Sequence, residues 1–248
     1  MRAELVTFAT PHYDAMMRRL AHSARPWFDK VNTFTPADLE PEFLAAHAEQ
    51  MRYSRGFGFW CWKPHLIRRV VASLPPEGVA MYCDSQCLFV RDPLPLLRIC
   101  RKNGGVLVFH QRREKRFNRE WTRDCCFEAM NCNEAKYWEG PQLNSAVTVW
   151  CNTPLALRTL DEMSRWVTTL DVVGDGLPGE KNHPEFRDHR HDQSIMSLLA
   201  IRDNLLTMPD PTQYGNGYEE AARGYPQILE INRQVSHPYA IPCQTPDL

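Results

Sequence analysis

The chain has 248 residues, a length typical of one large domain and sufficient for a core that needs no disulfide or metal to hold it. It carries 29 Lys and Arg against 30 Asp and Glu, a formal net charge of −1, which argues against a general nucleic-acid binder because such proteins usually have a clear basic excess. Hydrophobic residues make up 43% of the chain and charged residues 24%, which excludes wholesale disorder.

The N-terminal residues and the cysteines indicate a reducing compartment. The opening MRAELVTFATP is too short in apolar residues for a signal peptide, and no stretch of about 18 apolar residues predicts a membrane span. We therefore expect a cytoplasmic protein with free thiols. The nine cysteines include no CxxC pair, so we expect most of them to be small buried residues rather than metal ligands.

Strand-like and helix-like segments alternate along the chain. The patterns predict strands at residues 5–10, within 26–41, and at 79–83, 105–109 and 144–150. They predict helices at residues 13–24, 41–52, around 64–71, and at 94–101, 124–130, 154–167 and 193–200. This alternation predicts an α/β fold with a mostly parallel sheet flanked by helices, and no domain boundary before about residue 205.

One candidate functional residue is Asp84, in the segment Tyr82-Cys83-Asp84-Ser85. It follows a buried-type strand, and open α/β sheets bind ligands at the carboxyl ends of their strands. A carboxylate there suits Mg²⁺ or Mn²⁺. The alternative is a structural aspartate that caps the next turn.

A second candidate is the segment from His183 to Ser194, which holds three histidines, three acids and two arginines. His189, His191 and Asp192 are candidates for metal ligands or for an acid–base pair. The alternative is a solvated polar loop in which Asp192 caps the following helix.

Three further segments could contact a ligand. Arg55 and Lys63 flank a Gly-aromatic turn and could contact phosphate oxygens. The alternative is a structural turn whose aromatic side chains pack into the core. Residues 112–123 mix basic and aromatic side chains, which suits a solvated loop or a phosphate-facing lid. The polar residues 142–146 precede a strand and could hydrogen-bond a sugar.

Taken in order, these segments resemble a family of GT-A-fold glycosyltransferases found in bacterial polysaccharide loci and large DNA viruses. The resemblance covers about residues 3–213 and leaves residues 214–248 as a C-terminal extension that we expect to pack on the same domain. The segments are Thr-Phe-Ala-Thr (7–10), Arg-Gly-x-Gly-Phe-Trp-x-Trp-Lys-Pro (55–64), Tyr-x-Asp-Ser (82–85), Trp-Thr-Arg-Asp (121–124), Asn-Ser-Ala (144–146), His-Arg-His-Asp-Gln-Ser (189–194) and Pro-Asp-Pro-Thr-Gln (209–213).

The resemblance implies transfer of a hexosyl or deoxyhexosyl unit from a nucleotide-diphosphate sugar to a hydroxyl of a glycan acceptor, in polysaccharide biosynthesis. It implies catalytic roles for Asp84 and Asp192, and a metal held by Asp84 with His189 or His191. The residues expected to contact the donor are Phe8, Ala9, Thr10, Arg55, Lys63, Asn144, Ser145 and Gln193.

One position departs from the family pattern. The second acid of the Asp-x-Asp motif is replaced by Gln86, so a Mn²⁺ or Mg²⁺ ion would be held by one carboxylate together with water and phosphate oxygens. Two alternatives stay open. One is a metal-dependent hydrolase built on Asp84, His189, His191 and Asp192. The other is a nucleotide- or carbohydrate-binding module with a degenerate site.

Overall fold

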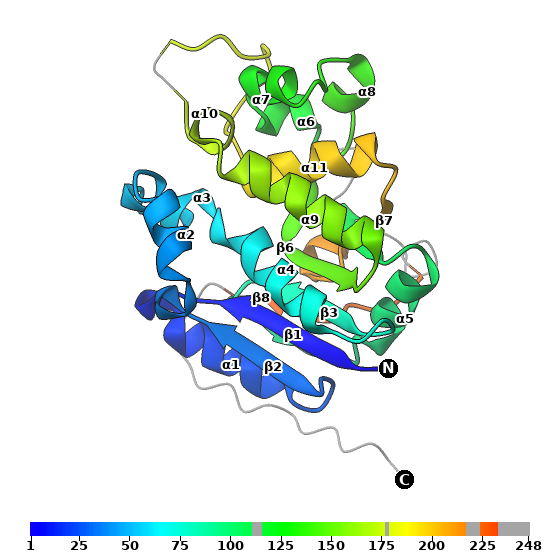
Figure 1. The fold of residues 1–248 in the computed structure, drawn as a ribbon. Helices are drawn as coiled ribbons and strands as arrows, with labels where there is room; N and C mark the ends of the chain where they lie inside the picture. The colour runs from blue at the N-terminus through cyan, green and yellow to red at the C-terminus, as the bar shows by residue number, and fades with distance from the viewer. Residues whose placement is uncertain (111–115, 177–178, 217–223, 233–248) are drawn as a thin grey trace.

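The computed structural model describes residues 1–110, 116–176, 179–216 and 224–232. Its main feature is a six-stranded sheet with the strand order β2-β1-β3-β6-β5-β7 (Figure 1). The strands are β1 (Ala3–Phe8), β2 (Lys30–Phe34), β3 (Val79–Cys83), β5 (Val106–His110), β6 (Leu143–Cys151) and β7 (Leu206–Pro209). A second sheet pairs β4 (Cys87–Phe89) with β8 (Leu229–Ile231).

The direction of β6 makes the large sheet mixed. β6 pairs antiparallel with β3 and β5, whereas β1–β2, β1–β3 and β5–β7 pair in parallel. β5 ends at His110, which pairs with Leu143 at the start of β6. Because the chain leaves and re-enters the sheet at the same edge, β6 must run in the opposite direction to its neighbours.

Side chains on the two faces of the sheet belong to two separate cores, since successive residues of a strand point to opposite faces. Val6, Ala80 and Val108 contribute to one core, and Leu5, Met81 and Leu107 to the other. The first core is closed by α4 (Trp62–Ser73), α9 (Pro154–Val167) and α11 (Asp192–Arg202), and the second by α1 (Asp14–Ala24) and α5 (Leu94–Lys102).

Short helices gather beyond α11, in the upper part of Figure 1. They are α6 (Asn118–Trp121), α7 (Asp124–Ala129), α8 (Ala135–Trp138) and α10 (Leu170–Val173). Two other short helices, α2 (Pro41–Ala46) and α3 (Gly56–Phe59), lead into α4. Arg123 ties this group to the 171–180 segment, because it pairs with Glu180 at 2.8 Å and donates to the carbonyls of Asp171 and Gly174.

The structure confirms the α/β class and the mostly parallel sheet flanked by helices, in which β6 is the antiparallel strand. β4, β7 and β8 were not predicted, and the expected helix at 41–52 is divided into α2 and a 3-10 turn at Gln50–Arg52. The division at residue 213 stays a prediction; of the extension, β8 pairs with β4. All eight cysteines in the described part of the chain are free, and Cys125 alone among them is not buried; Cys243 lies outside it. No helix within the described residues is long and apolar enough to cross a membrane.

Candidate active site

Several chain segments meet at one edge of the large sheet. The carboxyl ends of β1, β3, β5 and β7 share this edge with the amino end of β6. A cavity of about 440 Å³ opens there, beside β1 and β3. It is lined by Phe8, Ala9, Thr10, Tyr13, Ser54, Arg55, Gly56, Phe57, Trp60, Trp62, Tyr82, Asp84, Ser85 and Gln86.

Aromatic rings form one wall of this cavity. Phe8, at the end of β1, stacks on Trp62 with 3.9 Å between ring centroids, and Phe57 stacks on the same phenylalanine at 6.0 Å. Phe8 and Trp62 are almost fully buried. Flat apolar surfaces of this kind, with polar groups around them, are typical of sites that bind planar ligands.

The turn from residue 56 to residue 60 has an unusual backbone. All five residues, including Phe57, Phe59 and Trp60, have positive φ values between 50° and 79°. Left-handed backbone costs roughly 1–2 kcal/mol for each residue other than glycine. Trp62 donates its indole N–H to the carbonyl of Gly56 at 3.0 Å, and Gln50 donates to the carbonyl of Gly58 at 3.0 Å. These contacts hold the turn against the cavity.

A buried lysine joins two carboxylates from distant parts of the sequence. The Nζ of Lys63, in α4, lies 2.7 Å from Oδ2 of Asp192 and 3.5 Å from Oδ1 of Asp84. The same Asp84 oxygen accepts the phenol proton of Tyr82 at 2.7 Å. The ammonium also lies 3.5 Å from the backbone carbonyl of Ser145. Four elements of the fold are therefore connected at Lys63.

Burial and charge act in opposite directions on this cluster. Burial alone would lower the pKa of Lys63, but the carboxylates of Asp192 and Asp84 raise it above its ordinary value, so the ammonium stays charged. Burial and the neighbouring Asp84 carboxylate raise the pKa of Tyr82 well above its ordinary value. Tyr82 therefore remains a neutral phenol that donates its proton to Asp84.

The two acids differ in their access to the cavity. The side chain of Asp84 is 33% exposed and lines the cavity, whereas that of Asp192 is 4% exposed and is paired with Lys63. Lys63 itself is 3% exposed and lies behind Asp84. Asp84 is thus positioned to touch a ligand, and Lys63 and Asp192 support it from within the protein.

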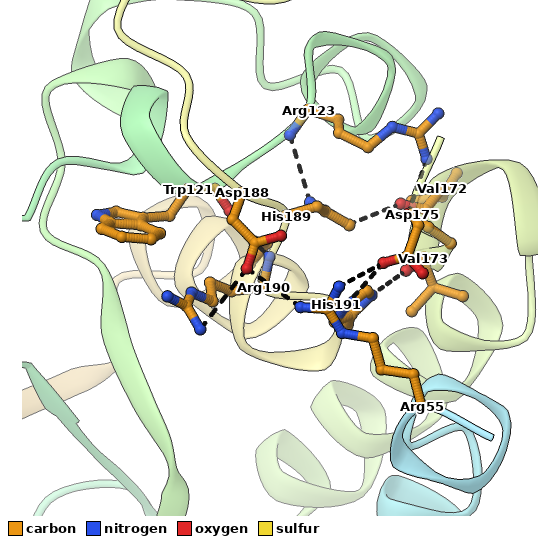
Figure 2. Close-up of polar contacts among 12 residues, drawn as sticks. Arg55, Trp121, Arg123, Val172, Val173, Asp175, Asp188, His189, Arg190 and His191 are labelled. Atoms are coloured by element: carbon orange, nitrogen blue, oxygen red, sulfur yellow. Dashed lines mark hydrogen bonds and ion pairs between the residues drawn. The ribbon is translucent and has the colours of Figure 1, made fainter. Parts of the chain in front are cut away.

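Both histidines of the 189–191 segment bind backbone groups (Figure 2). His189 accepts the N–H of Arg123 at its Nδ1 and contacts the carbonyl of Val172 through Nε2 at 3.0 Å. His191 contacts the carbonyl of Val173 through Nδ1 at 2.6 Å and stacks on Phe59. Burial lowers the pKa of both imidazoles, and for His189 the lowering is large.

This geometry bears on the expected metal site. Both ring nitrogens of His189 already have backbone partners, and His191 is turned toward Val173. Within the described ranges, no group of three or more His, Cys, Asp or Glu side chains is arranged to hold a metal ion. Asp84 alone, with its carboxylate facing the cavity, fits an ion whose other ligands come from water and a bound diphosphate. The roles of His189 and His191 as metal ligands stay predictions, and their backbone contacts argue against these roles.

Arg55 connects the cavity to the 170–190 segment. Its guanidinium lies 2.7 Å from Oδ1 of Asp175 and 3.1 Å from Oδ2 of Asp188 (Figure 2). Because Arg55 also lines the cavity, it is held where a phosphate oxygen could reach it.

Three other predicted contacts lie beyond the lining of this cavity. Asn144 donates to Oδ2 of Asp210 at 2.7 Å and accepts the N–H of Ala146. Ser145 is buried behind Lys63, and Gln193 lies in the first turn of α11. These residues belong to the same sheet edge but not to the wall of the cavity.

Sequence reasoning missed Tyr13 and Ser54 as lining residues, and it singled out Ser85 and Gln86 only as part of the motif around Asp84, without a ligand contact. It also missed the Asn144–Asp210 contact, although Asp210 stands directly after β7, the position at which Asp84 follows β3. That shared position was the available signal. Of the 112–123 segment, residues 112–115 lie outside the described residues, and Trp121 contacts helix α11 rather than the cavity.

No family model matches the sequence, and no curated protein matches it. The fold, however, matches solved structures of GT-A glycosyltransferases, so the chain has a GT-A fold.

Three of these structures are similar over most of this chain. Mouse xyloside xylosyltransferase 1 superposes with a TM-score of 0.51 at 10% identity, over 96% of this chain and 100% of that one. The galactosyltransferase LgtC, in complex with donor and acceptor sugar analogues, superposes with a TM-score of 0.53 at 13% identity, over 93% of this chain and 87% of that one. The bifunctional glycosyltransferase WbbM superposes with a TM-score of 0.53 at 12% identity, over 94% of this chain and 46% of that one. This chain therefore spans about half the length of WbbM.

Proposed function

We propose that this protein is a glycosyltransferase that moves a sugar from a nucleotide-diphosphate sugar to an acceptor hydroxyl. The observation that supports this best is the cavity at the ends of β1 and β3, which combines an aromatic wall with the carboxylate of Asp84 on a fold of glycosyltransferases. Fold alone is a weak argument for function. The proposal therefore depends on the chemistry of the cavity.

The aromatic wall suits the donor's base, because the half-buried ring of Phe57 lines the cavity and is backed by the stacked rings of Phe8 and Trp62. Arg55 is placed to neutralise diphosphate oxygens. The leaving group is a nucleoside diphosphate, so the barrier falls when its developing negative charge is neutralised.

A divalent cation, Mn²⁺ or Mg²⁺, completes this proposal. Asp84 would hold the ion from the protein side, with Oδ1 fixed by Tyr82 and Lys63. The ion would supply positive charge to the diphosphate. Asp192, buried against Lys63, acts as a positioning residue rather than as a base that reaches the acceptor.

The wider proposal includes a hexosyl or deoxyhexosyl donor, a glycan acceptor, polysaccharide biosynthesis and a cytoplasmic location. The metal-dependent hydrolase has less support, since His189 and His191 are engaged by backbone groups. A binding module without turnover remains the second candidate, because Asp84 is the only carboxylate among the described residues that line the cavity.

A thermal-shift screen of nucleotide-diphosphate sugars with and without Mn²⁺ tests the proposal. A ligand at about 100 times its Kd adds about 2.7 kcal/mol of stability, which is roughly a 5–10 °C rise in Tm for a chain of this size. We expect one donor class to give this shift, and Asp84→Asn to reduce the part of it that depends on Mn²⁺. Asp161→Asn, on α9, is the matched control. If no nucleotide sugar moves the Tm, the proposal is wrong; if donor binds and no acceptor is glycosylated, the binding module replaces it.

A further inference from the structure

Three guanidinium groups surround one tryptophan at the end of α6. The Cζ atoms of Arg116, Arg187 and Arg190 lie 5.2, 5.9 and 4.4 Å from the centroid of the Trp121 ring. Figure 2 shows Arg190 beside this ring. Attraction to the negative face of an indole holds cations near it, so Trp121 collects these side chains in one place.

Among the described residues, two carboxylates, Glu120 and Asp188, lie against these three guanidinium groups. Arg187 pairs with Glu120 at 2.9 Å. Arg190 lies 3.7 Å from Asp188, a carboxylate that Arg55 also contacts, at 3.1 Å. The described part of the chain gives Arg116 no carboxylate partner. Like charges repel at these distances, so a cluster of this kind favours a further anion.

Two buried polar atoms beside the cluster lack hydrogen bonds. The indole Nε1 of Trp121 and Oε1 of Gln142 have no partner among the described residues, and Gln142 is 1% exposed. Buried polar groups are nearly always satisfied, because leaving one without a partner is costly. Of these two atoms, the indole N–H of Trp121 is a donor beside three guanidinium groups, and the oxygen of an anionic ligand could complete its hydrogen bonding.

The cluster joins the edge of the sheet that holds the cavity. The Ser194 hydroxyl, in α11 just after Asp192, donates to the backbone carbonyl of Trp121 at 2.6 Å and accepts from the Gln142 side chain at 3.3 Å. The backbone N–H of Gln142 donates to the carbonyl of Arg116 at 3.0 Å, and Gln142 directly precedes β6. The cavity adjoins β1 and β3, so the cluster lies further along the same edge.

We propose that the cluster of Arg116, Arg187 and Arg190 around Trp121 binds an anionic group, a phosphate or a carboxylate, on the acceptor. The inference rests on the proposed glycosyltransferase function and assigns an acidic acceptor to it. Planar guanidinium groups bind phosphates and carboxylates through two parallel hydrogen bonds. Trp121 fixes their positions in advance, which lowers the cost of ordering them on binding.

Three small probes of similar size test the charge requirement: methyl glucoside, glucose 1-phosphate and glucuronic acid. Each is titrated into protein saturated with a nucleoside diphosphate, so that the donor cavity is filled, while the indole N–H signal of Trp121 is followed by NMR. We expect both anionic sugars to shift this signal and the neutral sugar not to shift it. A larger effect of glucose 1-phosphate assigns the site to phosphates, and a larger effect of glucuronic acid assigns it to carboxylates.

Substitutions then separate binding from structure. We expect Arg116→Gln together with Arg187→Gln to weaken the binding of the anionic probes at least tenfold. Arg116→Lys, in place of Arg116→Gln in this pair, should recover part of the lost affinity. Arg165→Gln is the matched control, because Arg165 makes a similar contact, 4.7 Å from the ring of Trp166 on α9. This substitution should leave the binding of the anionic probes unchanged. Equal response to neutral and anionic sugars overturns the proposal, as does unchanged binding in the double variant; if the double variant does not fold, the probe comparison in the parent decides.

Failure of the acceptor site and failure of the proposed function give different results. The Trp121 signal reports the cluster directly and does not require turnover. If no nucleotide binds but anionic sugars still shift this signal, the glycosyltransferase proposal fails and the anion site stands. If nucleotide sugars bind and no anionic sugar moves the signal, the acidic acceptor is wrong and the donor site stands.

Discussion

Lys63 connects the two acidic residues, Asp84 and Asp192, that lie far apart in the sequence. Its ammonium is buried between Asp192 and Asp84, yet only Asp84 of the three lines the cavity. A change at Asp192 therefore acts on the interior of the protein, and a change at Asp84 acts on the ligand.

This difference leads to a prediction on stability. Removing one partner of a buried ion pair costs about 3–5 kcal/mol, so Asp192→Asn should lower the Tm by roughly 6–20 °C. Lys63 keeps its contact with Asp84 in this variant, so we expect the loss of Tm to lie toward the lower end of this range. Asp84→Asn, with a third of its side chain exposed, should melt within a few degrees of the parent while losing transferase activity. Thermal melting of the two variants, with activity measured in parallel, checks the expectation.

A double variant serves as the control for this pair. Replacing both partners of a buried ion pair by apolar residues is often neutral for stability, so Lys63→Met with Asp192→Leu should regain much of the Tm lost in Asp192→Asn. Activity should not return, because Asp84 loses the ammonium that fixes it. Recovery of both properties would show that the Lys63 contact is not needed for the reaction.

At the scale of elements, the turn α3 is the most strained part of the cavity wall. Gly56 has a φ of +59°, and a Cβ at this position would collide with the ring of Trp60. The flanking rings of Phe57 and Trp60 line the cavity. The position of these rings therefore depends on glycine at residue 56.

We expect Gly56→Ala to destabilise the protein by at least 1–2 kcal/mol and to weaken donor binding more than tenfold, because the turn must change shape to admit the methyl group. Gly179→Ala is a matched control: Gly179 also has a positive φ, +83°, but a Cβ there meets no atom within 4 Å. Binding of a nucleotide-diphosphate sugar, measured by calorimetry on both variants, checks this. Similar donor affinity in the two would contradict it.

Elements with strong local patterns were predictable, and those that depend on distant partners were not. The strand at 79–83 and the helix at 154–167 were predicted with the bounds that the structure shows, since apolar runs and Thr153-Pro154 at the helix start are local signals. β4 and β8 have three residues each and form only because they pair with each other. The left-handed turn at 56–60 has no sequence signal beyond its two glycines.

At the scale of the molecule, the topology decides which residues meet. The sequence indicated Asp84, Lys63 and Asp192 separately, but their contact depends on β3, α4 and α11 converging at one edge of the sheet. It also suggested His189 and His191 as metal ligands. Their backbone partners at Val172 and Val173 come from α10, which the sequence pattern did not predict.

These two buried histidines also make the stability of the whole fold depend on pH. Burial lowers the pKa of both below the ordinary value of 6.5, so the unfolded chain binds protons that the folded chain excludes. The stability that they contribute is therefore fully present well above pH 6.5 and falls as the pH drops through 6.5 toward the folded-state pKa values. Each histidine contributes a slope of up to about 1.4 kcal/mol per pH unit in that window.

We expect the free energy of unfolding, measured by urea denaturation, to fall by up to about 2.7 kcal/mol per unit below pH 6.5, through these two side chains alone. Between about pH 7.5 and pH 8.5 they should contribute almost no slope, because the unfolded histidines are then nearly all neutral, and this range provides an internal control. His189→Asn should reduce the acid slope by about half, because an amide can still bond the Val172 carbonyl without titrating. An unchanged slope in this variant would show that His189 is not excluded from protonation in the folded state.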